Sequence, residues 1–94
     1  MKPLSDERVA DLAARIEQDG FAIMRDAIQP DFLEEILAEI DRLERVRPGG
    51  DIPPGPFTGH VTRRWFDLLN DGEVWQRVAV HPWVLQVLPL VLAV

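Results

Sequence analysis

The sequence predicts an α+β fold that is mostly helical, with about four helices and one or two short strands. Two observations predict the helices: apolar residues recur at helical spacing on both sides of Gly20, and Pro30 and Pro82 stand where helices commonly begin. A third observation, a short and wholly apolar run directly after Gly20, predicts a strand. Because 94 residues allow at most one domain, we expect residues 1–94 to belong to a single one.

A first helix is predicted over residues 5–19. Ser5 is a suitable N-cap, because its hydroxyl can accept a hydrogen bond from the first turn. Between Val9 and Ile16 the apolar residues fall on one side of a helix, and Gly20 stands where a glycine often ends one. We interpret this helix as a packing element.

A strand and a longer helix are predicted next. Phe21–Met24 is wholly apolar, which suits a short strand covered on both faces. Pro30 fits the first helical position, where its missing N–H is not needed. From Leu33 to Leu43 the apolar stripe continues, and the carboxylates fall mostly on the opposite side. We interpret these carboxylates as a solvated face and not as a catalytic pair, because nothing in the pattern would desolvate them.

The middle of the chain is predicted to be a loop. Residues 48–59 contain eight prolines and glycines among twelve positions, and loops of this length are uncommon in compact domains unless they are functional or disordered. The following Val61 suits a second strand or an extended segment, and a short helix is predicted over residues 73–79. His81 precedes a proline at a helix start, so we expect its ring to cap or to pack.

The last predicted helix starts at Pro82 and is strongly apolar. From Trp83 to Val94, ten of twelve residues are apolar, and Pro89 is expected to interrupt the run, which is too short to cross a bilayer. An uncovered apolar run invites association. We therefore expect residues 1–94 to be a partial domain whose next element covers this run, with self-association through Leu85–Val94 as the competing explanation.

Composition excludes several classes of function. The net charge is −6 and no basic stripe is present, so nucleic acid is not an expected partner. The chain has no cysteine, which excludes disulfides, thiolate metal sites and cysteine nucleophiles. The N-terminal residues are charged throughout and do not form a signal peptide. We expect a cytoplasmic protein without a membrane segment.

Two stretches of the sequence carry a family resemblance. The first is LSDERVADLAARIEQDGFAIMRDAIQPDFLEEILAEIDRLE, and the second, after the loop, is TRRWFDLLNDGEVWQRVAVHPWVLQVLPLVL. In this order they resemble the N-terminal part of the phytanoyl-CoA dioxygenase family, and the resemblance covers nearly the whole chain. It implies a segment that precedes and flanks a double-stranded β-helix, or jelly roll. It also implies an oxygenase that depends on Fe(II) and 2-oxoglutarate.

The chain departs from that family at the metal ligands. The resemblance implies an iron site made by a His-x-Asp pair and a distant histidine, the facial triad of non-haem oxygenases. Here His60 is followed two positions later by Thr62 and His81 by Trp83, so neither histidine begins such a pair. We therefore expect no catalytic residue, metal ligand or bound cofactor in this chain, with the family's triad and 2-oxoglutarate site beyond position 94.

Three residues near the loop are candidates for a position close to a substrate: His60, Arg63 and Arg64. The guanidinium groups of the arginine pair suit a carboxylate or phosphate, and in the family this segment is expected near the substrate entrance. The alternative for the arginines is ion pairing within the chain, with Asp67, Asp71 or Glu73.

The sequence leaves three functions open. The first is the N-terminal part of an oxygenase that hydroxylates a small or lipid-like substrate, inactive by itself, so whether the chain is an enzyme stays undecided. The second is a non-catalytic interaction module that pairs through its apolar C-terminal run. The third is a small helical structural protein.

Overall fold

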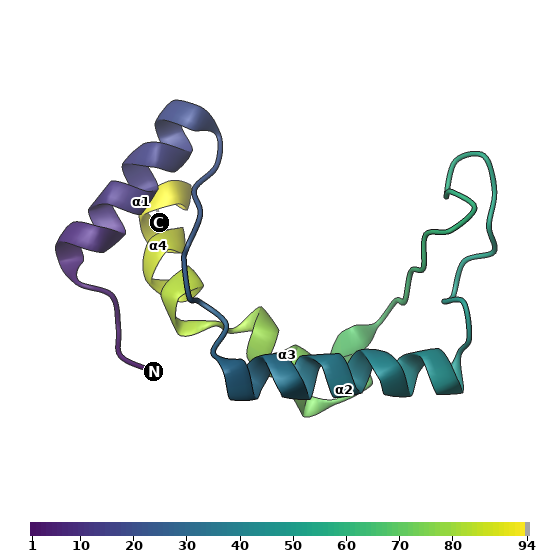
Figure 1. Cartoon of the computed structure of the whole chain (residues 1–94). Helices are drawn as coiled ribbons and strands as arrows, with labels where there is room; N and C mark the ends of the chain where they lie inside the picture. The colour runs from purple at the N-terminus through teal and green to yellow at the C-terminus, as the bar shows by residue number, and fades with distance from the viewer. Residues whose placement is uncertain (94) are drawn as a thin grey trace. The chain divides into compact units, whose positions relative to one another are not determined.

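A computed structural model describes residues 1–93, and the fold is mostly helical, as predicted (Figure 1). Two compact units divide the chain: one combines residues 1–28 with the residues from Ala79 on, and the other is Gln29–Val78. The helices are α1 (Asp6–Asp19), α2 (Pro30–Val46), the 3-10 helix η1 (Leu68–Asn70), α3 (Glu73–Ala79) and α4 (Pro82–Leu92).

The two ends of α1 follow the prediction. The Ser5 hydroxyl accepts a hydrogen bond from the Arg8 amide (3.1 Å), so it satisfies one of the free N–H groups of the first turn. Gly20 adopts a left-handed conformation with φ of 83°, and its amide donates to the Ile16 carbonyl (2.8 Å). A glycine has no Cβ to resist this conformation, so the helix ends there.

The predicted strand at Phe21–Met24 is wrong, and so is a strand at Val61, because residues 1–93 contain no strand and only an isolated bridge between Gly55 and Gly59. The four residues are instead an irregular connection. Phe21 and Ile23 are each 64% exposed, whereas Ala22 and Met24 pack on the core of the first unit. The alternation is that of a strand, but a strand also needs a neighbour to accept its backbone hydrogen bonds, and the described residues provide none.

The core of the first unit lies where α1 and α4 pack side by side (Figure 1). Val9, Leu12 and Val87 are its buried residues. The Gln86 side chain fixes the N-terminal segment here, because it accepts from the Leu4 amide (2.9 Å) and donates to the Leu4 carbonyl (3.0 Å). This amide therefore satisfies both backbone groups of Leu4.

α4 continues through Pro89, contrary to the predicted interruption. Proline has a backbone φ that a helix accepts, so its cost lies in the missing N–H and in its contact with the preceding turn. Ala93 caps the C-terminal end of the helix. It has a left-handed conformation with φ of 56°, and its amide donates a hydrogen bond to the Pro89 carbonyl. The apolar residues of α4 remain largely exposed, among them Leu85 (49%) and Leu92 (61%).

The second unit is built on α2, which begins at Pro30 as predicted. Leu43 is 1% exposed, but Leu33 and Leu37, on the same predicted stripe, are 45% and 52% exposed. Contacts of Arg77 join α3 to the start of α2: its guanidinium pairs with Glu35 (2.7 Å) and lies over the Phe32 ring, 4.6 Å from the ring centroid. The apolar stripe of α2 is therefore covered mainly toward its C-terminal end.

Candidate functional site in the proline- and glycine-rich loop

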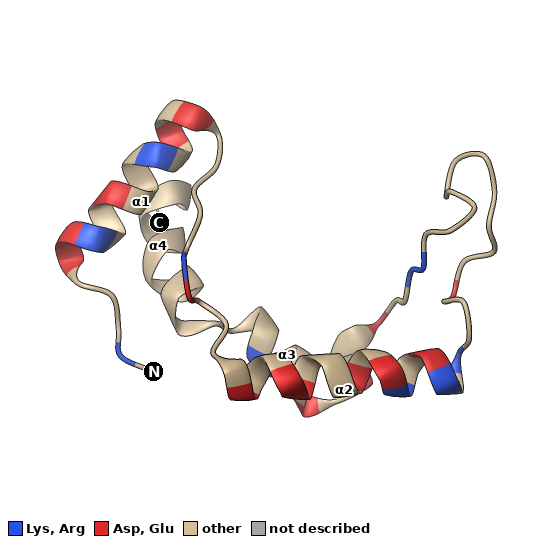
Figure 2. Cartoon of the chain, in the orientation of Figure 1, with Lys and Arg blue, Asp and Glu red and all other residues tan. Residues whose placement is uncertain are grey.

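The structure places the three candidate residues in the long connection between α2 and η1. His60, Arg63 and Arg64 are all exposed. Arg63 and Arg64 follow residues 52–62, which contain no lysine, arginine, aspartate or glutamate, and Figure 2 shows the loop with a long uncharged stretch. Arg63 approaches Glu44 of α2 (Nε–Oε1 3.7 Å), and the Arg64 carbonyl accepts a hydrogen bond from the Asp51 amide (2.6 Å). Their proximity to a substrate stays a prediction.

None of the described ion pairs joins Arg63 or Arg64 to Asp67, Asp71 or Glu73, as one alternative predicted. Arg63 pairs with Glu44, and the Asp71 carboxylate is held by another arginine. Arg47, which caps the C-terminal end of α2, holds Asp71 with both terminal nitrogens (2.8 and 3.1 Å). Its Nε also forms an ion pair with Asp51 Oδ1 (2.8 Å). A guanidinium fork matches a carboxylate in this two-point geometry, so Arg47 is better placed for Asp71 than either loop arginine.

A second arginine completes the cluster. Arg42 donates from Nε and Nη2 to the two carboxylate oxygens of Glu39 (2.6 and 3.1 Å) and from Nη2 to the Asp71 carbonyl (3.0 Å). Gly72 lies directly beside it, because a Cβ at this position would come within 2.7 Å of Glu39 Oε1. The cluster therefore joins α2 to the turn that precedes α3.

These contacts shift the ionisation of the groups involved. The hydrogen bonds from Arg47 lower the pKa of Asp71 below its ordinary value, and those from Arg42 lower the pKa of Glu39. In return, the bonds to Asp71 raise the pKa of Arg47, and the bonds to Glu39 raise that of Arg42. All four groups therefore stay charged at neutral pH, and the cluster is a structural network of ion pairs.

Arg47 and Asp51 were not singled out from the sequence. A weak signal was present, because Arg47 and Asp51 are four residues apart. However, α2 ends at Val46, so this spacing does not lie within a helix, and Asp71 is a further 20 residues along the chain. The ion pair of Arg47 with Asp71 forms only when the loop between them folds back, so no periodic pattern in the sequence indicates it.

His81 has the capping role predicted for it. Its Nδ1 accepts a hydrogen bond from the Trp83 amide (3.1 Å) at the start of α4, so the proton resides on Nε2 and points at the Ala27 carbonyl (2.6 Å). The side chain is 6% exposed. Both ring nitrogens are thus engaged within the first unit, which leaves neither of them to a metal ion.

The residues present do not fit the iron site that the family resemblance implies. Residues 1–93 contain no group of three or more histidine, cysteine, aspartate or glutamate side chains placed to hold a metal ion. Of the two histidines, His81 uses both nitrogens in hydrogen bonds and His60 lies exposed on the loop. No step of oxygen chemistry can therefore be assigned to these side chains.

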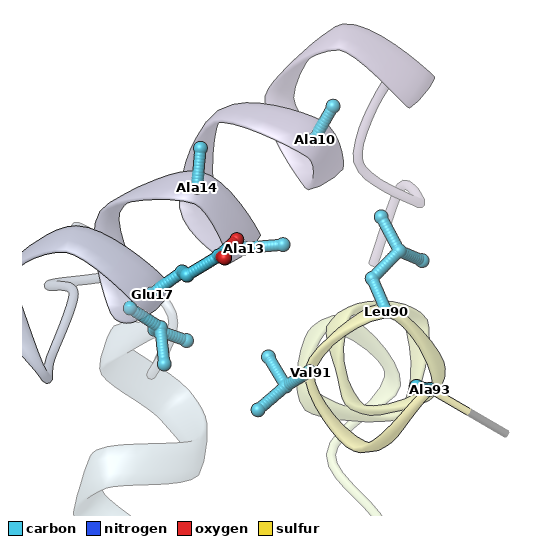
Figure 3. A pocket seen from close by; sticks show the side chains of 8 residues that line it. Ala10, Ala13, Ala14, Glu17, Leu90, Val91 and Ala93 are labelled. Atoms are coloured by element: carbon cyan, nitrogen blue, oxygen red, sulfur yellow. The ribbon is translucent and has the colours of Figure 1, made fainter.

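A shallow hollow between α1 and α4 has a volume of about 610 Å³ (Figure 3). α1 contributes alanines and Glu17, and α4 contributes Leu90 and Val91. Glu17 is the one ionisable side chain that lines it. The lining is apolar apart from one exposed carboxylate. Such a surface suits packing against another element, and it does not bring together the groups that catalysis requires.

No helix among residues 1–93 combines the length and the apolar character needed to cross a lipid bilayer. Comparison of the chain with protein-family models, with curated proteins and with solved structures finds no match.

Proposed function

We propose that this chain is the N-terminal part of an oxygenase of the phytanoyl-CoA dioxygenase type, which hydroxylates a small or lipid-like substrate. In this proposal the chain supplies a helical cover for a jelly-roll domain. The polypeptide beyond position 94 supplies the ligands for Fe(II) and 2-oxoglutarate. The chain alone is inactive, and the location of the protein is cytoplasmic.

The observation that carries the proposal is the uncovered apolar surface of α4. Six large apolar residues of this helix are exposed by between 38% and 61%: Val84, Leu85, Leu88, Leu90, Val91 and Leu92. Burial of apolar area contributes about 25 cal/mol per Å², so a surface of this kind favours a covering element. A catalytic domain packed on α4 would be such an element.

The connection after α1 supports a sheet as the partner. Phe21 and Ile23 point away from the core while Ala22 and Met24 point into it, which is the two-residue period of a strand. A jelly-roll edge alongside Phe21–Met24 would accept its backbone hydrogen bonds and cover its exposed side chains.

The reading frame beyond codon 94 tests the proposal most directly. We expect it to encode a His-x-Asp pair followed by a distant histidine. The longer protein should decarboxylate 2-oxoglutarate in an Fe(II)-dependent reaction, whereas the 94-residue chain should not. Tight binding of Fe(II) by the 94-residue chain, or its own turnover of 2-oxoglutarate, would contradict the proposal.

The role of Arg64 can be tested in the longer protein. If Arg64 meets an anionic group of the substrate, Arg64→Ala should raise the KM for the substrate and leave the KM for 2-oxoglutarate unchanged. Arg45→Ala, at an exposed position of α2, is the control for loss of one positive charge. An unchanged substrate KM would remove Arg64 from the candidate site.

The same apolar surface also supports a second function, that of an interaction module which pairs through α4. The two functions predict different behaviour of the isolated chain. A module that self-associates should elute as a stable dimer during size-exclusion chromatography over a wide range of concentrations. A stable monomer would exclude pairing through the C-terminal run.

A further inference from the structure

The loop after α2 is closed at its base by contacts between its two ends. The Asp51 amide donates to the Arg64 carbonyl (2.6 Å), and Asp51 Oδ2 accepts from the Phe66 amide (2.9 Å). Gly50 lies against the same backbone, because a Cβ there would come within 2.7 Å of both the nitrogen and the oxygen of Arg64. Residues 51–64 therefore form a loop whose two ends adjoin.

Arg47 holds this base to the rest of the second unit. Its guanidinium bridges the carboxylates of Asp51 and Asp71, each at 2.8 Å. Its carbonyl accepts from Trp65 Nε1 (3.1 Å), on the return side of the loop. One residue thus contacts the outgoing side of the loop, its returning side and the turn before α3.

The tip of the loop has few contacts by comparison. The hydrogen bonds that the structure describes between residues 52 and 63 are internal: Thr58 Oγ1 donates to the Pro53 carbonyl (3.0 Å), and Gly55 and Gly59 pair with each other. Phe57 and Val61 are 96% and 93% exposed. Apart from the 3.7 Å approach of Arg63 to Glu44, the described polar contacts of the loop with α2 are at its base.

We propose that Arg47 is an ionic latch for the base of this loop: its guanidinium bridges Asp51 and Asp71, and loss of the bridge lets the two ends of residues 51–64 separate more often. The inference does not depend on the proposed function. Local opening of this kind is a common property of segments with few buried contacts. The latch acts beside two base contacts that do not use the Arg47 guanidinium, the hydrogen bonds from the Asp51 amide to the Arg64 carbonyl and from the Phe66 amide to Asp51.

A lysine cannot replace this arginine. The latch brings Nε within 2.8 Å of the Asp51 carboxylate as an ion pair without hydrogen-bond geometry, whereas Nη1 and Nη2 donate hydrogen bonds to Asp71, and the planar guanidinium fixes these nitrogens relative to one another. An ammonium group is a single point of charge on a flexible chain. Arg47→Lys therefore keeps the charge but breaks the two-carboxylate bridge.

Trypsin cleavage of the full chain after Arg64 reports the latch, because the Arg64 backbone forms part of the closed base. We expect Arg47→Lys to accelerate this cleavage at least about tenfold, together with hydrogen exchange of the Asp51 and Phe66 amides. Arg45→Lys, the same change at an exposed position of α2, should leave both rates unchanged. Equal rates in the two variants would overturn the proposal.

Asp51→Asn provides a second test that does not alter α2. Asparagine keeps an oxygen for the Phe66 amide but removes the charge that faces Arg47, so cleavage after Arg64 should again accelerate. Added salt should accelerate cleavage in the unaltered chain and have little effect on Arg47→Lys. Faster exchange along the whole of α2 in Arg47→Lys, equal to that at the loop base, would show a general loss of the helix and would also overturn the latch.

Discussion

Two adjacent glycines follow α2, and the structure requires a glycine at each position for different reasons. Gly49 and Gly50 both have positive φ values, 77° and 91°. A Cβ at Gly49 would meet nothing within 4 Å, whereas one at Gly50 would meet the backbone of Arg64 at 2.7 Å. The first position thus requires a glycine for its conformation alone, and the second requires one for conformation and space.

Alanine at these two positions should therefore have unequal effects. We expect Gly49→Ala to lower the free energy of unfolding by about 1–2 kcal/mol, the cost of a left-handed conformation. Gly50→Ala should lower it further, because the Arg64 backbone must also move. Urea unfolding followed by circular dichroism measures both values. If the two variants are equally stable, the close approach to Arg64 contributes nothing.

His81 carries two contacts that can be separated by substitution. His81→Ala loses the cap of α4 and the bond to the Ala27 carbonyl, so we expect a loss of about 1–3 kcal/mol in the free energy of unfolding. His81→Asn should lose less, because asparagine also caps a helix but is too short to replace the bond to Ala27. Thermal unfolding distinguishes the two variants. Equal losses would show that the cap itself adds no stability.

The boundaries of the helices were largely predictable from the sequence. Ser5 and Gly20 define the ends of α1 through local geometry, and Pro30 and Pro82 each begin a helix, as expected. Such signals depend on neighbouring residues alone. The strand at Phe21–Met24 was predicted wrongly because a strand depends on a partner, and Pro89 was wrongly expected to interrupt an apolar run that stays helical.

The candidate site was less predictable than the helices. The capping role of His81 follows from a histidine directly before Pro82, so it could be predicted. The partners of the arginines could not, because Arg47 reaches Asp71 only through the fold of the loop between them. Ion pairs between distant residues leave no spacing in the sequence, and Arg63 accordingly pairs with Glu44 and not with the carboxylates predicted for it.

The junction of α2 with the turn before α3 should be sensitive to acid. The pKa of Asp71 is lowered in the folded chain, so its ionised form stabilises the fold above the ordinary pKa of an aspartate, about 4. This stabilisation is lost as the pH falls from about 4 through the lowered value. Asp71→Asn should therefore reduce the loss of stability in this range. Thermal unfolding between about pH 2 and pH 7 measures it, and an unchanged slope would exclude Asp71 as a contributor.

At the scale of the whole molecule, the balance of buried and exposed apolar residues is unusual. Among the described residues four apolar side chains are buried, Val9, Leu12, Leu43 and Val87, while twenty large ones are exposed. Single exposed apolar residues are normal, but a run of them along α4 is a surface that favours association. If the isolated chain associates with other copies, we expect this surface of α4 to make the contacts.

A substitution at Leu92 tests that surface without disturbing the fold, because this side chain is already 61% exposed. Leu92→Glu removes an apolar group and adds one negative charge, so we expect this variant to have a lower apparent mass at high concentration than the unaltered 94-residue chain. Gln18→Glu on α1 adds the same charge at an exposed polar position and controls for general repulsion. Light scattering coupled to size-exclusion chromatography measures both variants. If Gln18→Glu reduces association as much as Leu92→Glu does, net charge and not the apolar surface of α4 governs the contacts, and the argument for a covering element on α4 loses its main support.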